Sequence, residues 1–540
     1  MATRKSIKLL NKGYSETGAS YIKKALKGFF ANSGSPNEDI NWNNQTLRER
    51  ARMLTMSGGL AASAVYTNTT NVIGCGLQLK SRVDFEYLGW SEQDAINWQK
   101  NVEREWALWA ENKRACDAMG MNDFYSLQKI AFTSAFTSGD CFALFKQYMP
   151  TNMLPYSLRI KLIEADRIST PHFRMTKTPL MITDGKADNG NRIYDGVEVN
   201  DDGLVTAYYV SNNYPWEMTT DLTKWVRVEA YGKKTGLPNI IQVMDAERPD
   251  QYRGLSKLAN VIEGLLQIRR YTESELMAAL IESFFTAFIK TEADTSSPVF
   301  NEAKSENQES LPEDENEYKM GPGVINNLKP GESVDFIDPK RPHSSFQNFV
   351  RAISVQLGAA LEVPADLLLK EFNSSYSAAR AALLEAWKAF RMRREYFVSN
   401  FCRPIYERWM YEAVARERII APGFFDDPLA RIAYLDSGFI GPSQGMLDPV
   451  KEITAEILAC ENGFSTRADS AIKINGSQWD SNVSQLKREN QQLAEATITN
   501  EVVTTLVKDT ISEALTEKEK EETEDGSKKQ SSKILEYGKR

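Results

Sequence analysis

Residues 352–369 read AISVQLGAALEVPADLLL, and residues 373–409 read NSSYSAARAALLEAWKAFRMRREYFVSNFCRPIYERW. The apolar helical pattern of the first stretch ends at Val363, because a residue that precedes proline is pushed out of the α region. A segment that mixes polar and aromatic side chains then leads into a long, alanine-rich helical pattern. A plain surface turn between two helices is usually shorter and more polar than this connection. The way in which these helices and the segment between them are arranged therefore decides the fold.

The residues before this stretch predict two more helices. An apolar stripe at helical spacing runs through residues 256–288. A helix of that length extends roughly 45–50 Å at 1.5 Å per residue. A second helix is predicted over residues 346–362, just before Pro364. Helices of this length are typical of struts.

The helix after the connection has separate charged and apolar faces. Its charged side chains fall within about 80° of one another at 100° per residue, and they are Arg380, Lys388, Arg391 and Glu395. Apolar side chains fill a different arc. We expect Pro404 to break or kink this helix, and residues 405–417 to continue as a helix.

The first half of the chain predicts helices followed by strands. Residues 46–70 and 91–112 have helical composition. YSLRIKLIEAD (156–166) alternates apolar and polar side chains as a strand does. A hairpin is predicted around Asp202-Gly203, a pair that supplies the positive φ of a tight turn, and residues 239–245 predict a buried strand. The fold class is therefore α+β and mostly helical.

Residues 293–319 are polar and strongly acidic, and they cannot bury enough apolar area to order alone. Residues 321–342 predict a short strand on either side of a turn at Lys329-Pro330-Gly331. Two interpretations of the acidic run stay open. A solvated loop is the commoner outcome, and a docking surface for basic partner segments is the alternative.

The two ends of the chain differ in character. Asp448-Pro449 predicts a helix start, with Asp at the N-cap and Pro at the first helical position, and Gly463 predicts its end. Two more short helices follow, to about residue 496. The last residues, 501–540, are charge-dense and expected to be disordered. The basic residues 1–45 form an arm that is either flexible or in contact with a neighbour or a phosphate backbone.

Composition excludes several classes of protein. The 540 residues carry a formal net charge of −8, which argues against a protein that coats nucleic acid. The five cysteines lack CxxC spacing and are typical of reduced, mostly buried thiols. Neither a membrane-spanning segment nor a secretory signal is indicated.

Enzyme chemistry has few candidates. His172 and His343 lie in dissimilar segments, there is no GxxxxGK[ST] motif, and we expect no cofactor and no catalytic activity. The remaining candidates for a two-metal site are carboxylates at common spacings, namely Glu164 with Asp166 and Asp426 with Asp427. A metal-dependent DNA-processing enzyme that uses such carboxylates is one candidate function, and a helical scaffold protein is another.

Four collinear runs carry a resemblance to a known family. They are YDGVEVNDDGLVTAYYV (194–210), ERPDQYRGLSKLANVIEGL (247–265), the stretch quoted at the start, and LDPVKEITAEILACENGFSTRADSAIKINGSQWDSNVSQLKREN (447–490). In this order and spacing, over about residues 45–500, the chain resembles the lambda-type portal proteins of tailed bacteriophages. The resemblance implies a homo-oligomer, a dodecameric ring at one capsid vertex, through which double-stranded DNA is packaged and ejected.

The resemblance also implies a division of the chain. Beyond the arm 1–45, it assigns a wing to 46–250, a first stem helix to 251–290, a clip with the acidic insert to 291–342 and a second stem helix to 343–363. A tunnel loop follows at 364–376, then a long kinked spine helix with the return of the chain to the wing at 377–450, a helical crown at 451–500 and the tail 501–540. The implied partners are the terminase large subunit, head-completion or adaptor proteins, and the major capsid and scaffold proteins, without a membrane. The implied location is the virion after assembly in the host cytoplasm.

The connection at 364–376 would then line the narrowest part of the channel. Its candidate DNA-channel residues are Lys370, Phe372, Asn373, Ser374, Ser375 and Tyr376. Lys370 is its only cationic side chain and is expected to touch phosphates without reading bases. The alternative is an ordinary helix–helix connection in which Leu367, Leu368 and Phe372 simply pack.

Candidate subunit-interface residues are Arg248, Arg253, Arg269 and Glu273. For ERPDQYRG (247–254) two interpretations stay open. Arg248 and Arg253 pair across subunits, which we favour, or the segment is only a capped turn from strand to helix.

Overall fold

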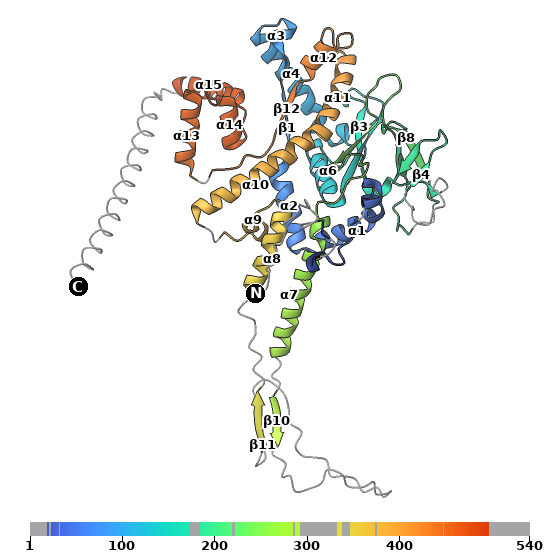
Figure 1. Cartoon of the computed structure of the whole chain (residues 1–540). Coiled ribbons are helices and arrows are strands. Elements are labelled where there is room, and N and C mark those ends of the chain that lie inside the picture. The colour runs from blue at the N-terminus through green and yellow to red at the C-terminus, as the bar shows by residue number, and fades with distance from the viewer. Residues whose placement is uncertain are drawn as a thin grey trace, which may run out of the picture.

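The computed structural model describes residues 19–20, 23–31, 33–172, 184–218, 222–283, 287–291, 332–336, 346–372, 375–446 and 448–495. Figure 1 shows a body of helices and sheets, a helical stem that leaves it, and a separate group formed by α13, α14 and α15 at its side. The described parts are α+β and mostly helical, as predicted. No described helix is both long enough and apolar enough to cross a membrane.

The first helices form one layer of the body. After the short 3-10 turn Lys24–Leu26 and the π-helical turn Asn37–Asn41, the helices are α1 (Trp42–Met56), α2 (Gly59–Val72), α3 (Phe85–Leu88), α4 (Glu92–Ala110), α5 (Lys113–Cys116) and α6 (Phe124–Ser138). The helical stretch predicted over 46–70 is thus two helices. Gly58 and Gly59 separate them, since both have positive φ (82° and 71°), a conformation that glycine adopts at low cost.

A three-stranded antiparallel sheet packs against these helices. Its order is β3 (Leu158–Glu164), β2 (Asp140–Gln147), β9 (Ile240–Met244), which confirms the strands predicted over 156–166 and 239–245. Alternate side chains of β2 face opposite sides. Cys141, Ala143 and Phe145 join the large helical core, whereas Phe142 joins a second core on the other face.

The second core lies against a five-stranded antiparallel sheet. Its strands are β4 (Asp184–Lys186), β5 (Arg192–Tyr194), β6 (Val197–Val199), β7 (Val205–Ser211) and β8 (Trp225–Glu229), in that order, and a 3-10 turn, Ala165–Arg167, precedes the sheet. The predicted hairpin at Asp202-Gly203 is confirmed between β6 and β7, with φ +86° at Gly203. The two sheets therefore share one core, to which Phe142, Val197 and Tyr208 contribute.

The stem contains α7 (Ile262–Ser283), after a 3-10 turn at Ala259–Val261, and α8 (Phe346–Ala360). At its far end β10 (Ala287–Thr291) pairs antiparallel with β11 (Glu332–Phe336), as Figure 1 shows. The prediction of one helix to residue 288 is wrong. The sequence FFTAFIKT at 284–291 is rich in aromatic and β-branched residues, which favour a strand.

The clip predictions are tested only in part. The strand predicted after the Lys329-Pro330-Gly331 turn is confirmed by β11. The strand predicted before it, that turn, and the acidic run 293–319 lie outside the described residues.

Beyond the stem, α9 (Ala365–Leu369) precedes α10 (Tyr376–Phe397), a π-helical segment Val398–Cys402 and α11 (Arg403–Ala415). The predicted irregularity at Pro404 is confirmed. Proline donates no backbone hydrogen bond, and its ring clashes with the carbonyl four residues earlier, that of Asn400. The helix accommodates both effects by widening to π geometry just before Pro404.

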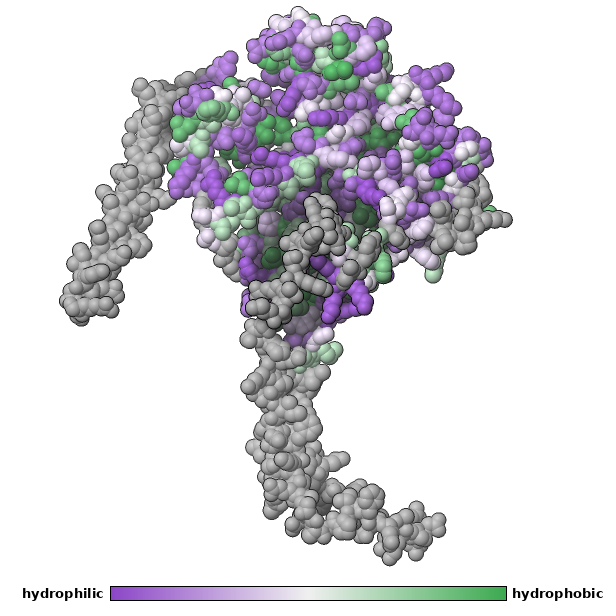
Figure 2. All heavy atoms as spheres, viewed as in Figure 1, coloured by the Kyte–Doolittle hydropathy of each residue, from purple (hydrophilic) through white to green (hydrophobic). Residues whose placement is uncertain are grey.

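The last part of the chain returns to the body and then leaves it. α12 (Pro428–Leu435) leads to β12 (Ser437–Ile440), which pairs antiparallel with β1 (Gln78–Ser81). α13 (Pro449–Glu461), α14 (Arg467–Asn475) and α15 (Trp479–Glu495) follow, with Asp448 as N-cap and Gly463 at φ +73°, as predicted. In Figure 2 hydrophobic atoms, in green, lie on the surface of this group, and Val450, Ile453 and Ile457 of α13 are all exposed.

Aromatic side chains fill the centre of the body. Trp106 of α4 lies 5.1 Å from the Phe124 ring and 5.1 Å from the Trp409 ring, both edge to face. Segments of the chain nearly 300 residues apart therefore share one core. Cys116, Cys141 and Cys402 are buried, Cys460 is partly buried and only Cys75 is exposed, all as free thiols, which confirms the expectation for the cysteines.

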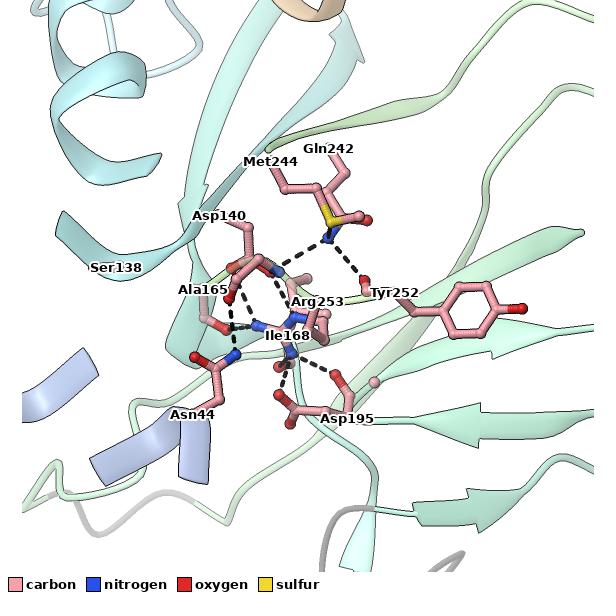
Figure 3. A network of polar contacts seen from close by, with 12 residues as sticks. Asn44, Ser138, Asp140, Ala165, Ile168, Asp195, Gln242, Met244, Tyr252 and Arg253 are labelled. Carbon is pink, nitrogen blue, oxygen red and sulfur yellow. Dashed lines mark hydrogen bonds and ion pairs between the residues drawn. The ribbon is translucent and has the colours of Figure 1, made fainter. Parts of the chain in front are cut away.

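Arg253 is a fully buried charge of the body, with a side chain that has no exposed surface. Figure 3 shows it between Asp140, at the start of β2, and Asp195, just before β6. Nε donates to Asp140 Oδ2 at 2.7 Å and Nη1 to Asp195 Oδ2 at 2.6 Å. The guanidinium also donates to the carbonyls of Ala165 and Ile168, each at 2.9 Å. Burial alone would lower its pKa, but the two carboxylates outweigh that effect and raise it.

The prediction that Arg253 pairs across subunits is therefore wrong. The side chain is fully buried within one chain and its donors are taken up by acceptors there, so it cannot reach a neighbour. The alternative interpretation, a capped turn from strand to helix within one chain, holds for this residue.

We predict that Arg253→Lys lowers the unfolding free energy by about 3–5 kcal/mol, the usual cost of breaking a buried ion pair. Lysine carries a point charge and cannot reproduce the planar fork of donors. Urea denaturation, followed by tryptophan fluorescence at fixed protein concentration, measures the effect. Arg248→Lys is the control and should cost under about 1 kcal/mol, because the Arg248 pair is exposed. Equal losses for the two variants would contradict the prediction.

Glu198 gives a prediction on pH. Burial alone would raise its pKa, but hydrogen bonds from Arg227, Asn189 and Asn191 outweigh burial and hold the pKa at about 2. A carboxyl with a depressed folded-state pKa stabilises fully above its unfolded pKa, and this contribution is lost as pH falls toward the folded value. Stability should fall between about pH 4.5 and 2, by on the order of 3 kcal/mol from this group. The measurement is the unfolding free energy, from urea denaturation, as a function of pH. Glu198→Gln should make this curve flatter between about pH 4.5 and 2, and Glu86→Gln, at an exposed position, should leave the curve unchanged. A Glu198→Gln curve as steep as that of the wild type would refute the assignment.

Candidate functional site

The segment singled out by the sequence lies where the stem, the long helix and α2 meet. Figure 1 shows α9 between α8 and α10, with α2 beside them. The last turn of α8 is tight. The Val363 amide donates to Gly358 O at 2.9 Å, and a Cβ at position 358 would lie only 2.5 Å from the Val363 carbonyl oxygen. Gly358 therefore permits the chain to turn from the stem into α9.

The connection is shorter than predicted. Residues 365–369 form α9 and Tyr376 begins α10, so the predicted span 364–376 is helical at residues 365–369 and again at 376, and the described residues between the two helices, 370–372 and 375, are not helical. Lys370 closes α9 in the left-handed conformation, at φ +57°, and its amide donates to Asp366 O. Pro364 supplies the N-cap, with the fixed φ that starts a helix.

Large side chains in this region divide into two groups. Leu368 is 1% exposed and Leu367 packs against the main core, as the alternative of an ordinary connection expected. Phe372 is 61% exposed and does not pack in this way. Among the side chains described between 370 and 375, Phe372 is thus the large apolar one that faces away from the body.

Lys370, the predicted phosphate contact, is bound within its own chain. Its Nζ donates to Thr67 Oγ1 of α2 at 2.8 Å. Ser375 is the exposed N-cap residue of α10 and makes no side-chain capping bond. Asn373 and Ser374, and the side chain of Tyr376, lie outside the described residues.

Two arginines that sequence reasoning missed join α10 to this region. Arg393 donates to Asn68 Oδ1 at 2.5 Å, to Leu361 O at 2.9 Å and to Glu362 Oε2 at 2.7 Å. Burial lowers its pKa, although Glu362 opposes the effect. Sequence reasoning selected other charges of this helix, and only the run RMRRE marked the position of this partly buried pair.

Arg394 caps α2. It donates to the carbonyls of Asn71 at 2.7 Å and Val72 at 2.9 Å, the last two residues of that helix, and to Pro442 O at 3.0 Å. A cation at a helix C-terminus is favourable because the exposed carbonyls carry partial negative charge. Burial lowers the Arg394 pKa to about 10.

The stem helices pack through aromatic side chains close to the body. Tyr271 of α7 lies 5.5 Å from the Phe346 ring and 4.8 Å from the Phe349 ring. Further along, Leu276 and Met277 of α7 are exposed by 64% and 58%. The stem therefore presents apolar side chains outside its own helix pair.

The remaining interface candidates have different outcomes. Arg269 pairs with Glu273 one turn later on α7 at 3.0 Å, and both are exposed. Arg248 pairs with Asp39 and also donates to Gly34 O, so it fastens the base of the N-terminal arm within one chain. An additional contact of these three residues with a neighbouring subunit stays a prediction.

Two of the four carboxylates considered for metal chemistry, Asp166 and Asp427, are engaged elsewhere. Asp166 pairs with Arg48 at 3.0 Å and with Arg52 at 2.5 Å. Burial would raise its pKa, but the two arginines outweigh this and lower it. Asp427 is the N-cap of α12 and accepts a hydrogen bond from Tyr87. Within the described part of the chain no three His, Cys, Asp or Glu side chains are grouped as metal ligands.

We predict that Arg393→Met lowers the unfolding free energy by about 2–3 kcal/mol, because it removes charged hydrogen bonds that are largely shielded from water. The exposed Arg391→Met on the same helix is the matched control and should change stability by less than about 0.5 kcal/mol. Urea denaturation at neutral pH provides the comparison. A loss for Arg393→Met no larger than the control would show that the junction does not depend on this residue.

Comparison with known proteins places the chain in a family. The family model described as phage portal protein, lambda family, matches residues 23–394. The portal protein of Escherichia phage N15 is 26% identical over 446 residues, which cover 78% of this chain and 80% of that protein. Portal protein B of Escherichia phage lambda is 24% identical over 441 residues, covering 78% of this chain and 79% of that protein.

Solved structures with a similar chain include the virion of a native gene transfer agent particle and the neck of an empty particle of this agent computed with C6 symmetry. The TM-scores are 0.40 and 0.42 and the identities 12% and 11%, and in both cases the match covers 81% of this chain and 94% of the other. The family match extends from the N-terminal arm through the stem and the connection to the end of the arginine pair on α10. Because that is more than half of the sequence, the chain belongs to the lambda family of phage portal proteins.

Proposed function

We propose that this phage portal protein works as a closed ring of about twelve identical copies at one vertex of the capsid, as the family implies. Double-stranded DNA passes through the centre of the ring during packaging and ejection, without sequence-specific recognition. The observation that carries the proposal is the family match over residues 23–394, which includes both stem helices and the connection between α8 and α10.

The exposed apolar side chains of the stem support a ring. Leu276 and Met277 on α7, and Phe349 and Val355 on α8, are each about half exposed or more in one chain. Burial of apolar surface is favourable by about 25 cal/mol per Å². Side-by-side packing of stems from neighbouring copies buries these side chains, and the exposed pair Arg269–Glu273 lies on the same helix.

The net charge supports passage without tight binding. Each neutralised phosphate releases counterions and strengthens binding of a basic surface to DNA. A formal charge of −8 per copy opposes such binding, so the DNA is free to slide. We assign the channel loop to residues 370–376, following the family, with Phe372 as its exposed aromatic side chain.

The other parts take the roles that the family implies. Residues 291–342 form a clip that meets the terminase large subunit and later the head-completion or adaptor proteins, and residues 451–500 form a crown that faces the capsid interior. The major capsid and scaffold proteins contact the ring from outside. The chain has no catalytic role, so ATP hydrolysis is supplied by the terminase motor. Assembly takes place in the cytoplasm of the bacterial host, before incorporation in the virion.

Mass photometry with negative-stain imaging of the purified protein tests the ring. Twelve copies of 61.0 kDa give about 732 kDa, and we expect particles of this mass with a central hole. Leu276→Glu on the stem should reduce the ring fraction, because it places a charge in the apolar contact. Leu204→Glu on the hairpin between β6 and β7 is the matched control, since both leucines are exposed by 60% or more.

Two outcomes would contradict the proposal. The first is a monomer of 61.0 kDa under all salt conditions that favour assembly. The second is divalent-metal-dependent cleavage of DNA that Asp166→Ala abolishes, which would favour the alternative of a DNA-processing enzyme.

A further inference from the structure

Helix α2 carries polar side chains in the middle of its length that are buried against the rest of the protein. Thr67 is 2% exposed and Asn68 is not exposed at all, and Ser63 lies one turn earlier on the same side. Such residues are unfavourable in the middle of a helix unless their polar atoms are bonded, because an unpaired buried polar group is costly. Each of the three has a partner: two of the partners lie at the end of α9 and the start of the loop, and the third lies near the C-terminal end of α10.

The contacts follow the chain in order. Ser63 Oγ donates to Leu368 O at 2.6 Å, in the last turn of α9, where helix carbonyls lack partners within the helix. Thr67 Oγ1 accepts from Lys370 Nζ at 2.8 Å, one turn further along α2. Asn68 Oδ1 accepts from Arg393 of α10 at 2.5 Å. One face of α2 therefore binds the end of α9, the first residue of the loop, and the helix that follows the loop.

Lys370 is held by its backbone as well as by its side chain. Its φ of +57° closes α9, and the amides of Lys370 and Glu371 both donate to Asp366 O. If the lysine side chain turned into the channel, the buried Thr67 hydroxyl would lose this partner. Lys370 is an exposed residue apart from this contact, and Phe372, two residues later, is an apolar side chain exposed by 61%.

We propose that α2 positions the channel loop, and that Lys370 acts through Thr67 as a positioning residue and does not bind phosphate. The assignment of the loop to the channel rests on the proposed function, whereas the hold of α2 on the loop does not. An aromatic side chain at the loop suits passage of a duplex, because contact through Phe372 neutralises no phosphate and releases no counterions. The loop thus touches the DNA without holding it.

A double-mutant cycle tests the hold of α2. Hydrogen–deuterium exchange of the full-length protein reports on the amides of residues 370 and 371. Thr67→Val and Lys370→Met should each speed exchange about tenfold, the size expected for loss of a hydrogen bond to a charged group. The double variant should exchange no faster than either single one, because both remove the same interaction. Thr67→Ser keeps the hydroxyl and should exchange like wild type.

Binding to DNA supplies a readout that a merely structural role would not change. We would measure the affinity of the protein for a linear duplex as a function of salt, where each phosphate contact adds about 0.9 to the slope of log K against log salt concentration. Lys370→Met should leave this slope at the wild-type value, as Thr67→Val should. A smaller slope for Lys370→Met alone would show that the lysine binds phosphate, and would overturn the proposal.

Additive exchange rates in the cycle would also overturn it. If a variant at position 67 fails to fold, Ser63→Ala takes its place and should speed exchange of the same amides at unchanged circular dichroism. The absence of rings from wild-type protein would sink the proposed function, but the exchange cycle on that protein would still decide whether α2 holds the loop.

Discussion

The guanidinium of Arg253 binds groups from three parts of the chain that the sequence keeps far apart. It joins Asp140 at the start of β2, Asp195 in front of β6, and the carbonyls that follow β3. Five donors in a rigid plane satisfy these acceptors together, which neither a lysine nor a neutral side chain is able to do. The two sheets share one core because this ion network fixes their relative position.

The same point fixes where the stem leaves the body. Gly254 follows Arg253 directly, and a Cβ there would lie 2.0 Å from the Gly139 carbonyl oxygen. Asn44 of α1 donates to Gly254 O at 3.0 Å, so the first helix also contacts this crossing. The segment that enters α7 is therefore bound on several sides immediately before it becomes a strut. A force on the stem reaches both sheets and α1 through these few residues.

A second junction, at α2, has the same character where the chain returns from the stem to the body. Arg393 binds the Asn68 side chain of α2, and Arg394 binds the carbonyls at the end of that helix. Arg393 also binds Glu362, where the chain turns from α8 toward α9. Both junctions use arginines that are largely or wholly buried. Buried arginine forks are costly to form and strongly directional, so they specify one arrangement of the elements that they connect. The stem is thereby fastened to the body both where the chain enters it and where the chain leaves it.

Sequence patterns by themselves determined the elements with strong periodicity. The alternation at 156–166, the positive-φ pair Asp202-Gly203 and the proline at 404 each predict a feature that the structure contains, because each acts over a few neighbouring residues. The collinear runs also led to the family. Tertiary structure alone decided the role of Arg253, which a local pattern presents as one more surface charge. It also decided that Lys370 reaches Thr67 and that the arginine pair of α10 is partly buried against α2. Those outcomes depend on which distant acceptors come within about 3 Å of a donor, and chain neighbours carry no information about that distance.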